Sequence, residues 1–286
     1  MKLCLGTAQF GLDYGINNSR GKIPRQEIFE ILNFAHDNEI IMLDTASAYG
    51  NSESVLGEAI APAGKYFQII TKYPVNTEIH PFQWIDTSLD LLKTERVHGY
   101  LFHNYSIFQD HPEYIEEFAK IKEAGKAEKI GFSLYYPSEA EYILKNNIPC
   151  DIVQVPYNIF DQRFACLFSE LKKKGIDIYV RSIFLQGLFF IEPDKLSSRF
   201  NSIIGLSKEI YKTSKDYLTN VAALCLGFVQ ANRDVSYIVI GVDSLNNLKE
   251  NVKNYNLIEE LNIPWYSFKR FAINDESVIL PFNWRK

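Results

Sequence analysis

Four residues whose side chains can donate or accept protons follow short apolar runs between residues 40 and 103 of the chain. Asp44 and Tyr49 come just after the apolar run at 40–43, within the stretch "MLDTASAYGNSE". Lys72 ends a second run, in "IITKYP", and His103 ends a third, in "GYLFHN". A strand buried in a core needs none of these side chains, whereas a catalytic rim at the ends of strands has a use for all four.

Together these side chains suit the protonation of an oxygen on which negative charge develops. A free tyrosine has a pKa of about 10, too high for an efficient acid near neutrality. A lysine ammonium beside the phenol would lower that pKa, and an aspartate paired with the lysine would keep the ammonium charged and in place. A neutral histidine can orient and polarise the same carbonyl. The set predicts reduction of a C=O group, provided that a hydride donor binds nearby.

Each residue taken singly has a simpler interpretation. A tyrosine in a loop is ordinarily a packing residue, and a lysine after a strand is ordinarily solvated. His103 alone is more often a structural hydrogen-bonding residue, and Asp44 alone can cap the next segment. Their joint placement at three successive strand ends is what favours a shared pocket.

Short apolar runs alternate along the chain with segments of helical periodicity. The predicted strands are Leu3–Gly6, Ile40–Leu43, Phe67–Thr71, His98–Phe102, Lys129–Phe132, Ile152–Val155, Ile176–Val180 and Tyr237–Ile240. The predicted helices are Pro24–Asp37, Ser52–Ile60 behind an Asn51 cap, Pro81–Lys93, Pro112–Ala124, Ser138–Lys145, Gln162–Lys174 stopped by Gly175, and Val221–Gln230.

Apolar strands that alternate with helices indicate a parallel sheet buried on both faces. Eight such units without a dividing linker predict an α/β fold, a (β/α)8 TIM barrel that forms a single domain over residues 1–286. An open doubly wound sheet is the alternative, but no GxGxxG follows the first strand. We interpret residues from Leu185 to about Ser214 as an elaborated loop, and Ile263–Lys286 as a tail over the active-site face.

Composition restricts the classes of function. The net charge is −5 and no basic stripe is present, which argues against nucleic-acid binding. The N-terminus lacks the apolar length of a signal peptide, and no run approaches a membrane span. The four cysteines are widely separated without CxxC spacing, as in a cytoplasmic protein with reduced thiols. We expect no metal site, no membrane contact and no protein partner evident from the sequence.

The motifs resemble the aldo-keto reductase superfamily over residues 3 to about 255. The resemblance rests on "GTAQFG", "DTASAYGNSESVLGEAI", "TKYP" and "LFHN". Its catalytic tetrad falls on Asp44, Tyr49, Lys72 and His103 of this sequence. The resemblance implies a (β/α)8 barrel and an NAD(P)H-dependent enzyme that reduces an aldehyde or ketone, with hydride from the nicotinamide and the proton from Tyr49.

The resemblance also implies a nicotinamide cofactor site. In "KIGFS" and "DIVQVPYN", Ser133 and Gln154 match the carboxamide-binding positions, although Leu134 stands where the family usually has asparagine. Arg181 stands where many members stack an aromatic ring on the nicotinamide. The segments "VRSIFLQGLF" and "IVIGVDSLNNLKENV" match the pyrophosphate and adenosine ends. The full predicted set is Gly6, Thr7, Asp44, Ser133, Gln154, Arg181, Ser182, Phe184, Gln186, Gly187, Leu188, Ile240, Gly241, Asn247, Glu250 and Asn251.

The family's habit favours NADPH, with NADH as the alternative because two residues weaken a strict preference. Asn247 stands where many NADPH-preferring members have an arginine, and Asp243 adds a negative charge nearby. The substrate is expected to be a small carbonyl compound. Its predicted contacts are Tyr14, Tyr49, His103, Tyr105, Phe160, Arg163 and the tail residues Phe282 and Trp284. The segment "GTAQFGLDYGI" resembles a branch associated with polysaccharide and nucleotide-sugar metabolism, which implies a sugar-derived substrate.

Two other functions fit the same residues. A barrel of this family can act as a nucleotide-binding redox sensor or regulatory subunit with little turnover, and such subunits can keep the tetrad. A lyase could use Lys72 as the nucleophile of a Schiff base, but an adjacent Asp44 would keep the lysine charged and unreactive.

Overall fold

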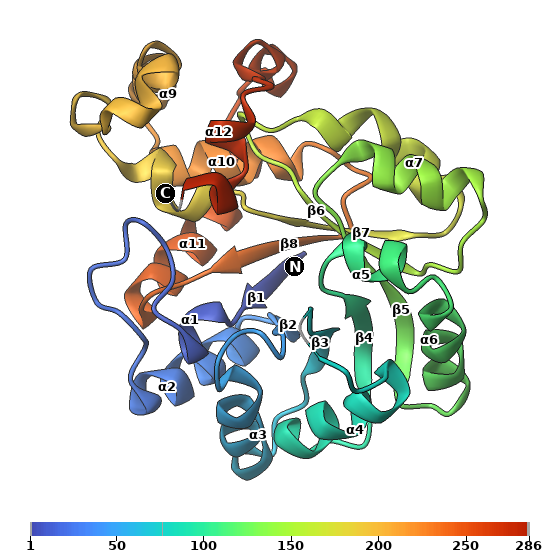
Figure 1. Ribbon diagram of the computed structural model, residues 1–286. Coiled ribbons are helices and arrows are strands. Elements are labelled where there is room, and N and C mark those ends of the chain that lie inside the picture. The colour runs from blue at the N-terminus through green and yellow to red at the C-terminus, as the bar shows by residue number, and fades with distance from the viewer. Residues whose placement is uncertain (1, 76, 285–286) are drawn as a thin grey trace.

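Eight parallel strands close into a barrel at the centre of the computed structural model, which describes residues 2–75 and 77–284 (Figure 1). The strands follow one another around the barrel in chain order, and β8 pairs with β1 to close it. They are β1 Leu3–Gly6, β2 Met42–Asp44, β3 Gln68–Tyr73, β4 Val97–Phe102, β5 Ala127–Ser133, β6 Ile152–Pro156, β7 Asp177–Arg181 and β8 Tyr237–Gly241. The prediction of a (β/α)8 barrel is confirmed.

Helices surround the barrel and connect its strands (Figure 1). The α-helices are α1 Ala8–Gly11, α2 Arg25–Asp37, α3 Ser52–Ala63, α4 Pro81–Leu92, α5 Tyr105–Asp110, α6 Tyr114–Glu123, α7 Pro137–Lys145, α8 Phe168–Lys173, α9 Ile204–Asp216, α10 Val221–Gln230, α11 Leu245–Leu257 and α12 Glu276–Ile279. The 3-10 helices are η1 Arg163–Leu167, η2 Leu185–Phe190, η3 Pro193–Lys195, η4 Ser198–Ile203, η5 Ile258–Glu260, η6 Trp265–Phe271 and η7 Pro281–Trp284. No helix in the described ranges is long and apolar enough to cross a membrane.

The inside of the barrel explains where the polar residues lie. One inward layer packs Cys4, Met42, Ile70, Leu101, Ile152, Tyr179 and Val239 against one another. Side chains alternate between the two faces of a strand, so residues two positions further on point inward again. Those positions carry Gly6, Asp44, Lys72, His103, Gln154, Arg181 and Gly241. The carboxyl ends of the strands therefore hold a polar layer directly above an apolar one.

The strand predictions ended too early at four of these positions. The structure places Asp44 in β2, Lys72 in β3, Arg181 in β7 and Gly241 in β8, whereas the sequence analysis ended each of these strands one residue before that position. The ladder continues because backbone pairing is indifferent to an inward polar side chain. The backbone N–H of Thr45, for example, still donates to the Ile70 carbonyl at 2.8 Å.

The segment predicted as one elaborated loop from Leu185 to Ser214 is largely helical, and that prediction is wrong. It contains η2, η3 and η4, and then most of α9, a helix of 13 residues. Helix α9 buries Ser207, Ile210 and Ser214 on one face, which explains why it is stable as a helix.

Two details of the predicted helices also differ. The helix predicted at Gln162–Lys174 is a 3-10 turn, η1, followed by α8, although Gly175 does follow it with a positive φ of 75°. Asn51 stands at the N-cap of α3 but makes no capping hydrogen bond. Its side-chain oxygen accepts from the ammonium of Lys22 instead, so the predicted Asn51 cap is wrong.

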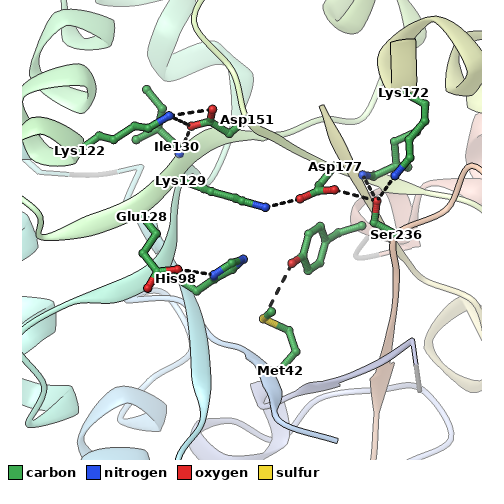
Figure 2. Close-up of polar contacts among 12 residues, drawn as sticks. Met42, His98, Lys122, Glu128, Lys129, Ile130, Asp151, Lys172, Asp177 and Ser236 are labelled. Atoms are coloured by element: carbon green, nitrogen blue, oxygen red, sulfur yellow. Dashed lines mark hydrogen bonds and ion pairs between the residues drawn. The ribbon is translucent and has the colours of Figure 1, made fainter. Parts of the chain in front are cut away.

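Ion pairs occupy the opposite, amino-terminal end of the barrel (Figure 2). Lys129 on β5 pairs with Asp177 at the start of β7, and His98 on β4 lies 3.0 Å from Glu128. The hydroxyl of Ser236 donates to Asp177 Oδ1 at 3.1 Å and accepts from the Ile178 backbone N–H. These contacts tie β7 to β5 and to the residue before β8, at the end of the barrel away from the polar layer.

We predict that Asp177→Asn lowers the free energy of unfolding by about 1–2 kcal/mol at pH 7. Burial raises the pKa of Asp177, but hydrogen bonds and charge from Lys129, with the Ser236 hydroxyl, lower it overall. The stabilisation should therefore be present near neutrality and disappear as the pH falls through the lowered pKa. Urea denaturation at pH 7 and pH 3 measures both effects.

Asp86→Asn is the matched control, because the Asp86–Lys126 ion pair is exposed and should contribute about 0–1 kcal/mol. Equal losses for the two variants at pH 7 would show that the half-buried Asp177–Lys129 pair does not stabilise β7.

Candidate active site

A buried ion pair forms the floor of the polar layer. Lys72 Nζ lies 2.7 Å from Asp44 Oδ1 and donates to the Thr45 carbonyl at 2.8 Å. The side chains of Lys72 and Asp44 are only 1% and 4% exposed. Gln154 Nε2 donates to the same Asp44 oxygen at 2.7 Å. Buried charges need partners of this kind, and these contacts fix the lysine beneath the cavity described below.

Tyr49 lies beside this pair, with its ring centroid 5.1 Å from Lys72 Nζ. The expected lowering of its pKa is wrong. Burial raises the pKa of Tyr49 well above its ordinary value, and the Asp44 carboxylate raises it further. The physical reason is that burial removes water from the phenol and so disfavours the charged phenolate, while the Lys72 ammonium is bound to Asp44 and the Thr45 carbonyl. The phenol is therefore fully protonated at neutral pH.

His103 packs edge-on against Tyr49, with ring centroids 5.7 Å apart. Burial, and then the positive charges of Lys72 and Arg181, lower the pKa of His103 to about 3. The imidazole is therefore neutral at physiological pH, as the sequence analysis expected. Its Nδ1 atom is buried and has no hydrogen-bond partner among residues 2–75 and 77–284.

A cavity of about 540 Å³ opens above these residues at the carboxyl ends of the strands. Asp44, Tyr49 and His103 line it, while Lys72 stays buried below. Its wall also contains these predicted cofactor residues: Gly6, Thr7, Ser133, Gln154, Arg181, Ser182, Phe184, Gln186, Gly187, Gly241 and Asn247. The structure thus brings the tetrad and most of the cofactor set to one place.

Comparison with known proteins gives the family. The model of the Aldo/keto reductase family matches residues 2–263, which is nearly the whole chain. The chain belongs to the aldo/keto reductase family. It is accordingly an oxidoreductase, and the family as a whole acts on carbonyl compounds with nicotinamide cofactors.

Individual relatives of the family are distant. The chain is 24% identical over 277 residues to "Uncharacterized oxidoreductase YqkF" of Bacillus subtilis, covering 88% of this chain and 90% of that one. It is 26% identical over 245 residues to "L-galactose dehydrogenase" of Arabidopsis thaliana, covering 78% and 76%. Among solved structures, aldo-keto reductase AKR11C1 from Bacillus halodurans (holo form) aligns with a TM-score of 0.73 at 21% identity, over 91% of each chain. That structure shares the fold.

The cavity fits the family's nicotinamide cofactor in its polar chemistry. Gln9 Oε1, like His103 Nδ1, is buried without a partner in the described part of the chain. Buried polar atoms without partners are costly, so a ligand with hydrogen-bonding groups would stabilise both. Asn247 lies in the first turn of α11, and a helix N-terminus of this length favours phosphate groups.

The backbone after β7 is strained where the family binds the pyrophosphate. Ser182, Leu185 and Gln186 all have positive φ, at 60°, 47° and 53°. Residues other than glycine adopt this conformation at a cost, and such strain concentrates at functional sites. Asn158 supports the turn by donating to the Ser182 carbonyl at 3.1 Å. The turn therefore presents backbone groups to the cavity in a fixed arrangement.

The guanidinium group of Arg181 is partly covered by neighbouring residues. Its guanidinium lies 4.2 Å from the ring centroid of Tyr135, and its Nη2 donates to the Leu134 carbonyl at 3.0 Å. Leu134 itself is fully buried. The position that is usually asparagine in the family therefore contributes a backbone oxygen to holding Arg181, and its side chain belongs to the core.

Four residues of the predicted cofactor set do not line the cavity. Leu188 and Ile240 are buried in the core. Glu250 is exposed on α11, and Asn251 is buried behind Asn247, to which its side-chain amide donates at 3.5 Å. These four residues match the family's motifs in the sequence, but their side chains do not line the cavity.

Four predicted substrate residues do not line the cavity in the structure: Tyr105, Phe160, Arg163 and Trp284. Tyr105 packs against Phe108 and Phe132, and Phe160 stacks on Phe189. These two side chains complete the core. Tyr14 and Phe282, by contrast, do line the cavity.

Arg163 and Trp284 are held by neighbours of their own. Arg163 forms an ion pair with buried Asp161 at 2.9 Å. Trp284 donates from its ring nitrogen to the Val278 carbonyl at 3.1 Å. Neither residue lines the cavity. The tail does reach the cavity through Pro281 and Phe282, which agrees with its predicted place over the active-site face.

Sequence reasoning missed several lining residues. They are Ala8, Gln9, Leu12, Gly15, Asn17, Asn18, Ala48, Tyr135, Ile183, Phe190, Val239 and Pro281. Gln9 lies inside the motif "GTAQFG", so that motif could have indicated it. Asn17 and Asn18 enter because the segment after α1 folds back over η2, where the Ile16 N–H donates to the Gln186 carbonyl at 3.1 Å. No local pattern in the sequence signals that contact.

Proposed function

We propose that the protein is an NAD(P)H-dependent reductase that converts an aldehyde or ketone to an alcohol. The observation that carries the proposal is the buried Lys72–Asp44 pair under a protonated Tyr49, next to a neutral His103 that lines the same cavity. An acid and a polarising group at one cavity wall, with a fixed positive charge buried beneath them, are what carbonyl reduction requires of the protein.

Each residue has a defined task in this proposal. Tyr49 holds a proton on its phenol oxygen and donates it to the carbonyl oxygen as negative charge develops there. Lys72 stabilises the phenolate that results, and Asp44 keeps the ammonium in place. His103 orients the carbonyl through a neutral ring nitrogen. When bound, the nicotinamide supplies the hydride for the carbonyl carbon.

The residues that would hold the cofactor divide along the cavity. All of them line the cavity or its strained turn. By the resemblance, Ser133 and Gln154 would hold the carboxamide, the turn at Ser182–Gln186 would hold the pyrophosphate, and Asn247 would hold the adenosine end. The family's habit favours NADPH. Asp243 also lines that end of the cavity, and its negative charge leaves room for NADH.

A sugar-derived carbonyl is the proposed substrate class. One support is the relative named L-galactose dehydrogenase. Another is the mixed lining of the cavity, where Tyr14, Tyr135 and Phe282 contribute rings and Asn17 contributes an amide group. Such a surface suits a polyhydroxylated compound, because rings can contact its C–H faces while amides bind its hydroxyls.

Fluorescence titration with NADPH and separately with NADH tests the cofactor assignment. We expect saturable binding of both, with NADPH binding at least about threefold more tightly. Binding of neither nucleotide would contradict the proposed function. Tight binding without turnover of any carbonyl would favour a regulatory subunit instead of a reductase.

A further inference from the structure

One buried carboxylate near the tetrad has no part in the mechanism above. Glu53 lies in the first turn of α3 and is only 4% exposed. Thr71 donates to its Oε1 at 2.5 Å. Burial raises the pKa of Glu53, and the hydrogen bond from the Thr71 hydroxyl opposes that rise. Burial of a carboxylate lowers the stability of the fold, and packing of α3 against the barrel does not require one at this position.

The hydroxyls around Glu53 belong to the segments that carry the tetrad. Thr71 directly precedes Lys72 on β3, and Ser47 lies between Asp44 and Tyr49. Ser47 Oγ donates to the Lys72 backbone carbonyl at 3.1 Å and accepts from Trp84 Nε1 at 3.0 Å. The network therefore joins the backbone of β3 to the loop that bears Tyr49.

Glu53 acts from the outside of the barrel wall. Adjacent side chains on a strand point to opposite faces, so Thr71 faces the helices while Lys72 faces the barrel interior. Glu53 accordingly does not line the cavity, whereas Tyr49 does. An effect of Glu53 on the reaction has to pass through the backbone of the 44–49 loop and β3.

We infer that Glu53 is a positioning residue for carbonyl reduction, which sets the place of Tyr49 relative to Lys72. It follows Tyr49 by four residues in the chain and binds Thr71, the residue directly before Lys72. The inference rests on the proposed function. Displacement of a reacting group by as little as 1 Å can cost about 100-fold in rate. Loosening the loop should therefore reduce turnover without removing any group that touches the ligands.

The test measures reduction of 4-nitrobenzaldehyde by NADPH in Glu53→Gln. We expect kcat to fall about tenfold or more, while KM for the aldehyde and Kd for NADPH stay within about twofold. Glu58→Gln is the matched control, since Glu58 lies on the same helix and its partner, Arg25, is exposed. Its kcat should equal that of the wild type.

A second variant keeps the inference testable if Glu53→Gln folds poorly. Thr71→Val preserves shape and removes one hydroxyl that Glu53 binds, so it should lower kcat in the same way. Because both changes break one network, the double variant should be no slower than Glu53→Gln alone. A kcat within twofold of the wild type in both single variants, with only the melting temperature lowered, would overturn the positioning role. Absence of turnover in the wild type would instead remove the proposed function, and this inference with it.

Discussion

Replacing Tyr49 with phenylalanine is expected to lower kcat for carbonyl reduction by about 10²–10⁴-fold. The change removes the phenol proton and leaves the ring that packs against His103 at 5.7 Å. Because Tyr49 is protonated at neutral pH, the wild type has the acid in its active form, and the variant has no other acid at that place. Steady-state kinetics with NADPH and an aldehyde, at saturating concentrations of both, measures the loss.

Two controls separate loss of the acid from loss of the site. The Kd for NADPH should stay within about twofold in Tyr49→Phe, because the ring is retained. Tyr105→Phe removes a phenol oxygen from a tyrosine that packs in the core outside the cavity, and it should leave kcat unchanged. Turnover by Tyr49→Phe within about threefold of the wild type would exclude Tyr49 as the proton donor.

Replacing Lys72 with methionine should lower the free energy of unfolding by about 3–5 kcal/mol. Lys72 and Asp44 are both buried, and their separation is 2.7 Å. Without the ammonium, the Asp44 carboxylate would remain inside the barrel with a single side-chain hydrogen bond, from Gln154. An unpaired buried charge of this kind strongly favours unfolding. Urea denaturation at pH 7 gives the difference.

The double variant Lys72→Met with Asp44→Asn should recover much of that loss, since it leaves no charge at the site. It should nevertheless remain catalytically inactive, because no ammonium is left to stabilise the phenolate of Tyr49. A double variant as unstable as Lys72→Met would mean that packing, not the unpaired Asp44, causes the instability.

The barrel could be predicted from the sequence because its strands are apolar on both faces and recur eight times. The lengths of those strands could not be predicted at their carboxyl ends. Asp44 and Lys72 are polar, yet they belong to β2 and β3 because a side chain facing the barrel interior does not interrupt the ladder. Helix α9 was mistaken for a loop because its buried face includes two serines, which weakens its apolar periodicity.

Site residues could be predicted where the position of a residue along its strand determines that its side chain points into the barrel. Asp44, Lys72, Gln154 and Arg181 all stand two residues beyond an inward apolar side chain, and alternation alone brings them together. Contacts between distant segments could not be predicted in this way. Tyr105 was predicted to contact the substrate because it is an aromatic residue just beyond a strand end. Its contacts with Phe108 and Phe132 show that it packs in the core.

Burial of Tyr49 was the other property that sequence alone did not reveal. Proximity of Lys72 suggested a lowered pKa for Tyr49, but burial of the phenol raises that pKa, and the Asp44 carboxylate raises it further. The depth at which the ring is buried follows from the fold and is not visible in the local sequence.

Transfer of isotope from the cofactor tests the central claim most directly. Purified protein would be incubated with NADPH carrying two deuterium atoms at C4 of the nicotinamide and with an aldehyde such as D-glyceraldehyde. Mass spectrometry of the alcohol then locates the label. The account predicts one deuterium on the former carbonyl carbon, at a rate that Tyr49→Phe nearly abolishes. Alcohol without deuterium, or no alcohol from any of a panel of aldehydes and ketones, would contradict it.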